Sequence, residues 1–192
     1  MKNLFFSILF IGIMTTINSQ TKLPYYEIPE APKEFTAGSV ASRMVDGLGF
    51  RYYWATEGLT EKDLKFQPNK DARTTKETLK HIYDLTTVII NAVLEKPNTG
   101  KKVPEMSFSE MRKNTLLNIE KSSAILRDSK DISKYKIIFI RGEKTTAYPF
   151  WNQINGPISD AIWHVGQVVS FRRSSGNPFP KGVSVLRGKK SD

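Results

Sequence analysis

The chain has 192 residues and no cysteine, and its 29 Lys and Arg outnumber its 19 Asp and Glu, which gives a formal net charge of +10. The absence of cysteine excludes disulfides, thiolate nucleophiles and zinc–sulfur sites, and the length suits one domain with a proper core. No basic helix with interleaved aromatic residues and no recognisable nucleic-acid module accompanies the charge, so we expect no nucleic-acid partner. We interpret the charge as favouring solubility, with a weak attraction to anionic envelope surfaces as the alternative.

Residues 1–19 have the layout of a secretory signal peptide. Lys2 precedes the apolar run Leu4–Met14, which polar residues follow. The run is shorter than the roughly 20 apolar residues that span a bilayer. We expect cleavage near Ser19 and export to the periplasm or the medium. The alternative is that the segment is kept as an amphipathic or buried N-terminal helix.

Two long helices are predicted in the first half of the remaining chain. Residues 20–35 contain three prolines and should form an extended lead. A helix is predicted over 36–57, because apolar or aromatic residues recur there every three or four positions, at Ala41, Met44, Leu48, Tyr52 and Ala55. After a polar connection, Thr74 and Glu77 fit a capping box that opens a second helix over 75–95.

A third helix is predicted over 108–128, and Ser107 with Glu110 forms a second capping box at its start. Between this helix and the last one, residues 134–150 contain a short apolar run followed by a turn sequence. That pattern is typical of a short strand or hairpin.

The last helix is expected to be interrupted at Pro157 and to end near Gly176. Arg172 and Arg173 in its last turn are expected to be solvated, close to the negative end of the helix dipole. The basic tail, residues 179–192, is expected to be loosely held. Four amphipathic helices over 36–178 predict an all-α four-helix bundle, with the extended or hairpin segment before the last helix.

Side chains that can bind a metal lie on two of these helices. Asp160, His164 and Gln167 share one face of the last helix, and His81 lies at the edge of the apolar face of the helix over 75–95. Two imidazoles and a carboxylate from facing helices suit zinc, nickel or iron and leave coordination positions open, and Gln167 could orient a bound group. The alternative, from spacing alone, is that the histidines are hydrogen-bonded in the core without a metal.

Further side chains are candidates for the surroundings of such a site. Glu77 and Asp84 lie one turn on either side of His81 and could orient its ring. Tyr52 or Trp163 could form a wall of the pocket, although packing is the alternative role for Trp163. The paired Glu-x-x-His motifs of a di-iron bundle are absent, and no serine has an adjacent histidine that would support nucleophilic catalysis.

Three stretches resemble the DinB-like superfamily of bacterial four-helix proteins: RMVDGLGFRYYWATEGLT, LKHIYDL and DAIWHVGQVVSFRR. The ending WHVGQVVSFRRSSGNP is similar to the family's His-x-x-x-His-x-Gly-Gln stretch, and the resemblance covers about residues 36–178. In that family one histidine of the second helix and two of the last commonly bind a divalent metal. The resemblance therefore implies His81, Asp160 and His164 as ligands, with Asp160 where the family usually has histidine.

The resemblance also implies a range of functions. Some members of the superfamily are thiol-dependent transferases that use low-molecular-weight thiols, and some dimerise through helix faces. We therefore expect an exported metal-binding protein, a metal-dependent transferase or hydrolase acting on an unidentified small molecule, with a homodimer as an expected assembly. Export makes a cytosolic thiol a less expected cosubstrate. The alternative is a non-catalytic exported binding or structural protein with no metal.

Overall fold

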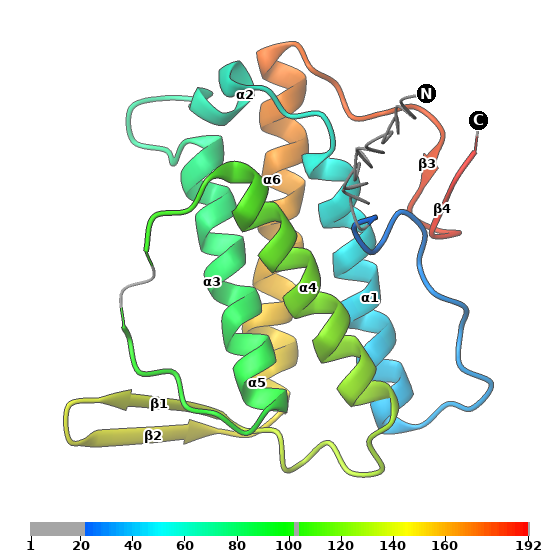
Figure 1. The fold of residues 1–192 in the computed structure, drawn as a ribbon, viewed down its shortest axis with the longest axis vertical. Coiled ribbons are helices and arrows are strands. Elements are labelled where there is room, and N and C mark those ends of the chain that lie inside the picture. The colour runs from blue at the N-terminus through cyan, green and yellow to red at the C-terminus, as the bar shows by residue number, and fades with distance from the viewer. Residues whose placement is uncertain (1–21, 102–103, 192) are drawn as a thin grey trace, which may run out of the picture.

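The computed structural model describes residues 22–101 and 104–191 (Figure 1), so the predicted signal segment, 1–19, lies outside the described residues. The described chain is mostly helical. Its four long helices are α1 (Ala37–Thr56), α3 (Thr75–Val93), α4 (Phe108–Arg127) and α6 (Ser159–Ser175). None of the helices among the described residues combines the length and apolar character that crossing a membrane requires.

Reciprocal side-chain caps set where three of the long helices, α1, α3 and α4, begin. At the start of α3, Thr74 Oγ1 accepts a hydrogen bond from the Glu77 backbone N–H at 3.2 Å, and Glu77 Oε2 accepts from the Thr74 backbone N–H at 2.8 Å. Ser107 and Glu110 form the same pair before α4, as predicted. Each cap satisfies backbone N–H groups that have no partner within the helix. The predicted starts of α3 and α4 are therefore confirmed.

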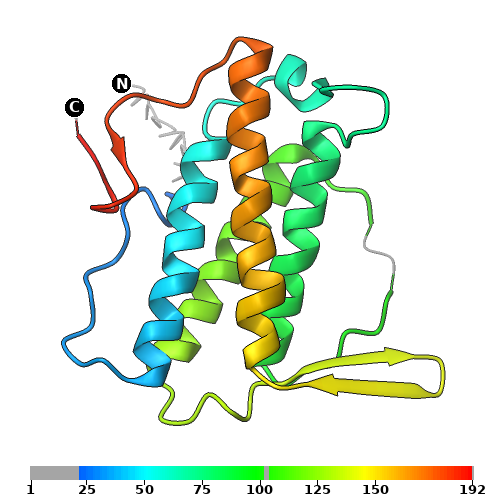
Figure 2. The ribbon, with the colours of Figure 1, turned by 180° about the vertical axis from the view of Figure 1, so that it is seen from behind.

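The four long helices stand side by side in a bundle-like arrangement (Figures 1 and 2). Both α1 and α3 pack against α4 and against α6, so each of these helices has two neighbours. The space between them is filled by fully buried side chains that include Leu48, Leu79, Ile82, Leu116, Ile119 and Val168. Such burial of one apolar face per helix is the main stabilising contribution to the fold.

The last helical segment is interrupted as predicted. A short helix α5 (Trp151–Gln153) leads into a π-helical turn (Ile154–Ile158), which continues into α6. The backbone of Gly156 leaves the helical region, and Pro157 follows it. Since proline lacks the N–H that an α-helix needs at this position, the wide turn is the local solution. At the other end, Gly176 adopts a left-handed conformation with φ 96° and ends α6.

A hairpin precedes α5, which confirms the predicted hairpin segment. Strand β1 (Ile137–Arg141) pairs antiparallel with β2 (Lys144–Tyr148). The loop after α3 is attached to β1, because Asn98 donates its backbone N–H to Ile138 O at 2.7 Å and accepts from the Ile140 N–H at 2.9 Å. The hairpin therefore connects the end of α3 to the start of the last helical segment.

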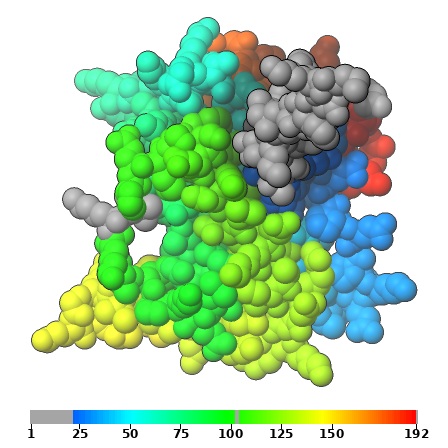
Figure 3. Space-filling view, in the orientation of Figure 1, coloured from blue at the N-terminus to red at the C-terminus, as the bar shows by residue number. Residues whose placement is uncertain are grey.

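The C-terminal tail differs from the expectation of a loosely held segment. It forms a small hairpin of β3 (Val183–Ser184) and β4 (Lys189–Lys190). The Ile28 N–H donates to Gly188 O at 2.9 Å, and the space-filling view shows the lead in blue beside the tail in red (Figure 3). The prediction for the tail was wrong because its partner, the lead, is distant in sequence.

The lead is itself anchored to α1. The Tyr25 ring is buried against Gly49, where a Cβ atom would lie only 2.6 Å from ring carbons. Its hydroxyl donates to Asp46 Oδ1 at 3.0 Å, and the buried Asp46 also accepts hydrogen bonds from Ser123 and Arg127 of α4. Burial raises the pKa of Tyr25 far above its ordinary value, and the carboxylate of Asp46 adds to the shift.

Arg172 also differs from its prediction. It was expected to be solvated, but the residue is only 2% exposed. It donates to the backbone carbonyls of Trp54 and Ala55, in the last turn of α1, at 2.9 and 3.1 Å. It also donates to Asn177 O at 2.8 Å and to Asn177 Oδ1 at 3.0 Å. Arg172 therefore caps the C-terminal end of a neighbouring helix. Arg173 is exposed, as expected.

The short helix α2 (Glu61–Lys65) joins the same cluster through Asp63. Burial disfavours the charged carboxylate of Asp63, but hydrogen bonds outweigh it: Ser175 Oγ and Asn177 Nδ2 donate to the carboxylate, and so do the N–H and hydroxyl of Thr60. These donors hold the pKa of Asp63 well below its ordinary value. The cluster joins α2 to the ends of α1 and α6.

Candidate metal centre

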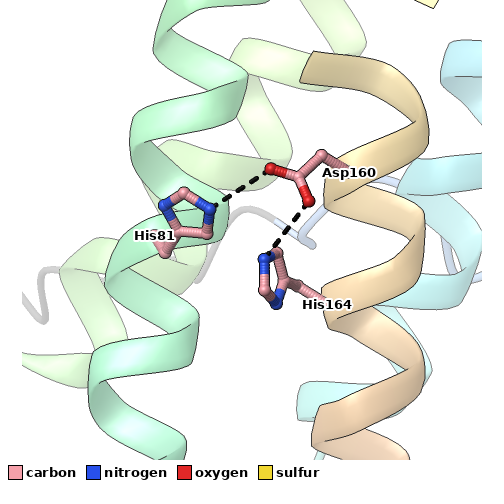
Figure 4. A group of neighbouring side chains, drawn as sticks. All are labelled: His81, Asp160 and His164. Atoms are coloured by element: carbon pink, nitrogen blue, oxygen red, sulfur yellow. Dashed lines mark hydrogen bonds and ion pairs between the residues drawn. The ribbon is translucent and has the colours of Figure 1, made fainter. Parts of the chain in front are cut away.

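The three predicted ligands lie together between α3 and α6 (Figure 4). His81 comes from α3, and Asp160 and His164 come from α6. His81 Nε2 lies 3.3 Å from Asp160 Oδ2, and His164 Nε2 lies 3.3 Å from Asp160 Oδ1. One ligand atom of each residue falls within 4.8 Å of the other two. The sequence-predicted group is thus assembled from two helices.

Helix geometry explains why these side chains meet. Asp160 and His164 are four residues apart and so lie one above the other on α6. Direct packing of α3 on α6 brings His81 to the same place. The two imidazole rings meet edge to face, with centroids 4.6 Å apart and planes at 85°. The rings therefore present separate edges to the space around the Asp160 carboxylate.

Gln167 determines which nitrogen of His164 faces this space. His164 Nδ1 lies 2.7 Å from Gln167 Oε1. With the Gln167 amide oxygen placed as the acceptor, the ring proton is assigned to Nδ1. In the neutral ring this leaves a lone pair on Nε2, the atom that faces Asp160. Gln167 is predicted to orient a bound group, whereas in the structure it pairs with His164. The three-residue spacing of His164 and Gln167 is the sequence signal for that pairing.

With the ring proton on Nδ1, a positive charge would favour the contact between His164 and Asp160. A lone pair on Nε2 and a carboxylate oxygen 3.3 Å apart are both acceptors and repel each other. Either a second proton on the ring or a metal cation between the donor atoms removes this repulsion. The residues present fit a metal ion, because hydrogen bonding of the distal ring nitrogen is the usual support for a metal-binding histidine.

The group is partly accessible to solvent. The side chains of His81, Asp160 and His164 are 30%, 38% and 15% exposed. A structural metal site is typically closed by four protein ligands, whereas a catalytic one keeps a position open for water or substrate. Three potential ligands with this exposure would leave a position open if they held a metal ion.

Glu77 and Asp84 have other partners than the predicted one. The carboxylate of Glu77 caps α3 through Thr74, and these hydrogen bonds lower the pKa of Glu77. Asp84 accepts from Lys80 Nζ at 2.6 and 2.7 Å. Among the described residues neither carboxylate has a hydrogen bond to His81, so the predicted orienting role has no support in this geometry.

Tyr52 and Trp163 were predicted to form a wall of the pocket. Tyr52 is fully buried in the core, and burial raises its pKa to about 12. The side chain of Trp163 is instead 72% exposed. Tyr52 packs in the core and Trp163 is exposed to solvent, so neither position supports a role as a wall of the pocket.

The donor atoms define what this group can do. Two imidazole nitrogens and one carboxylate oxygen could hold a divalent cation between two helices, with positions left for a further ligand. A cation held in this way could bind water or a heteroatom of a small molecule. The chemistry has to follow from these residues alone, because no family model, no curated protein and no solved structure matches this chain.

Proposed function

We propose that the protein binds a divalent metal ion at His81, Asp160 and His164 and is a metal-dependent transferase or hydrolase acting on a small molecule. The observation that carries the proposal is the convergence of these three side chains from α3 and α6, with one ligand atom of each within 4.8 Å of the others. A place in the DinB-like superfamily is part of the proposal. Four long helices, with a histidine on the second and Asp-x-x-x-His on the last, support it.

The donor set favours zinc, nickel or iron. Imidazole is a good ligand for all three ions, and a carboxylate in place of a third imidazole is compatible with each of them. Gln167 holds the ring of His164 so that Nε2 faces the site, and such support raises the basicity of the ligand. A hydrogen bond to the distal nitrogen of His81 would come from solvent on its exposed side.

The chain's own residues define the remaining steps. When bound, the metal would lower the pKa of a coordinated water or thiol and so supply a nucleophile near neutral pH. Asp160 has two carboxylate oxygens, and the one that does not bind the ion could accept the proton of that nucleophile. The partial exposure of the three side chains leaves access for a small molecule.

The competing interpretation is a non-catalytic protein in which the histidines serve the fold. The specific observation that favours it is that Asp160 already lies within 3.3 Å of a nitrogen of each histidine. If His164 carries two protons, the three residues form a hydrogen-bonded ion pair that needs no metal. This interpretation predicts that added metal leaves the melting temperature unchanged.

Elemental analysis of untagged protein, residues 20–192, distinguishes the two interpretations. We expect near-stoichiometric zinc, nickel or iron in the wild type and its loss in His164→Ala. The matched control is Asp84→Asn, since this carboxylate lies on the same helix as His81 but pairs with Lys80. It should retain the metal.

Thermal unfolding gives a second readout. A metal at one hundred times its Kd adds about 2.7 kcal/mol to the stability of a protein that binds it, so the wild type should melt at higher temperature with metal and His164→Ala should not. Metal-free wild type after reconstitution, with an unchanged melting temperature, would refute the metal proposal. Metal retention would justify assays of thiol transfer and hydrolysis.

Export to the periplasm or the medium, a small-molecule substrate and a homodimer stay predictions from the sequence. The excess of Lys and Arg over Asp and Glu is compatible with weak attraction to anionic envelope components. Analytical ultracentrifugation of residues 20–192 would report the assembly state, and fractionation of cells that express the full chain would report export.

A further inference from the structure

A second candidate site lies on the other side of α6. A groove of about 570 Å³ runs between α1, α6 and the segment that follows α6. Its lining residues on α6 recur every three or four positions, from Ile162 through Val169 to Arg173. At about 100° per residue this stripe is roughly opposite the face of Asp160 and His164. Figure 2 shows α6 between α1 and α3, with the tail on the α1 side.

The floor of the groove is apolar. Ile162 and Val169 of α6, with Phe179 and Val183 of the tail, pack against the core while keeping part of their surface exposed. Gly166 lies in the middle of the α6 stripe, and a Cβ atom built there meets nothing within 4 Å. The groove therefore has open space over a hydrophobic surface, and its volume falls in the range of small-ligand sites.

The charged side chains that line the groove are all positive. Arg51 of α1 and Arg173 of α6 are its charged lining residues, and no carboxylate is among them. Arg51 Nη1 donates to Gly47 O at 3.0 Å, which leaves its other N–H groups for a ligand. Within the described ranges neither arginine is in an ion pair. A carboxylate would therefore find two uncompensated guanidinium groups at the edge of an apolar surface.

The tail that forms one wall is held in place. Its hairpin closes through the Ser191 N–H, which donates to Gly182 O at 3.0 Å, and it is joined to the lead by the hydrogen bond from Ile28 to Gly188. A wall that is already positioned lowers the ordering cost of binding.

We propose that this groove binds one amphipathic organic anion, a carboxylate attached to an unbranched alkyl chain. The carboxylate would lie between Arg51 and Arg173, and the alkyl chain would cover the apolar floor beside Gly166. Burial of the chain and the charge-assisted hydrogen bonds supply the two contributions to affinity. This site shares no lining residue with the proposed metal centre, so it stands or falls independently of it.

Isothermal titration of residues 20–192 with decanoate, below its micelle concentration, tests the proposal. We expect saturable binding of one decanoate per chain and binding of decanol that is weaker by roughly tenfold or more, since the alcohol has the same chain without the charge. Arg51→Gln and Arg173→Gln should each weaken decanoate binding by a similar factor. Arg141→Gln, in the distant β1–β2 hairpin, is the control and should leave it unchanged.

A steric variant separates the groove from general surface charge. Gly166→Leu places a side chain in the open space, and leucine favours a helix more than glycine does, so the variant should fold and lose decanoate binding. Circular dichroism of each variant checks that helix content is kept. Equal affinity for decanoate and decanol, an unaffected Arg51→Gln/Arg173→Gln double variant, unchanged binding by Gly166→Leu or no saturable binding would each overturn the proposal. His164→Ala should bind decanoate as the wild type does.

Discussion

Replacing the buried Arg172 with leucine is expected to destabilise the protein strongly. The guanidinium is 2% exposed and supplies donors to the carbonyl oxygens of Trp54 and Ala55 in the last turn of α1. Leucine fills part of the same volume but donates nothing. A buried carbonyl left without a partner costs about 1–3 kcal/mol, so two of them cost about 2–6 kcal/mol. Removing a buried charge recovers part of this cost, and we expect a net loss of about 3 kcal/mol.

Urea unfolding followed by circular dichroism measures the effect. With a slope of roughly 2 kcal/mol per molar urea, a loss of about 3 kcal/mol lowers the unfolding midpoint by about 1.5 M. Arg173→Leu is the matched control, because this neighbouring arginine is exposed and surface substitutions usually change stability by less than about 0.5 kcal/mol. Equal midpoint shifts in the two variants would refute the role assigned to Arg172.

Three further predictions concern the centre, the pH dependence and the lead. Gln167→Leu should weaken metal binding by about 10–100-fold in a chelator competition assay, because it removes the acceptor for the ring N–H, whereas Gln167→Glu should retain it. The lowered pKa of Asp63 stabilises the fold above the unfolded value of about 3.9, so this contribution is lost as pH falls through that range towards the folded pKa; Asp63→Asn should flatten the acid limb of a stability–pH curve. Gly49→Ala should lower the melting temperature, because its Cβ meets the ring of Tyr25, whereas Gly47→Ala, which meets only a flexible arginine, should raise it. Equal shifts for the two glycine variants would contradict the packing of the lead.

Local signals made much of the fold predictable. Thr74 with Glu77 marks a helix start within four residues of sequence, and Pro157 interrupts a helix through its own missing N–H. The candidate centre was predictable for a similar reason, since the four-residue spacing of Asp160 and His164 places both on one face. The third residue of the group had to come from another helix. His81 was the candidate, because the sequence has only two histidines.

What could not be predicted depends on contacts between distant segments. The burial of Arg172 follows from the position of the end of α1, which no neighbouring residue of α6 indicates. The low pKa of Asp63 requires hydrogen bonds from Ser175 and Asn177, which lie more than 100 residues later, at the end of α6. The basic composition of the tail predicts a loosely held segment, because its hydrogen bond to the lead depends on residues more than 150 positions away. The periodicity of apolar residues predicts which face of a helix is buried. It does not predict that the carbonyl groups at the end of α1 accept hydrogen bonds from Arg172.

The hydrogen bond between Ile28 and Gly188 gives the described chain an almost circular course. The lead and the tail meet on the α1 side of the helices, so the described backbone returns close to where it started (Figures 1 and 2). Contacts of such long sequence separation slow the folding of a chain, because closing a long loop costs entropy. Because the lead and the tail meet, a circular permutant of residues 22–191 opened in the exposed β1–β2 turn at Gly142 is expected to keep the same helical interior.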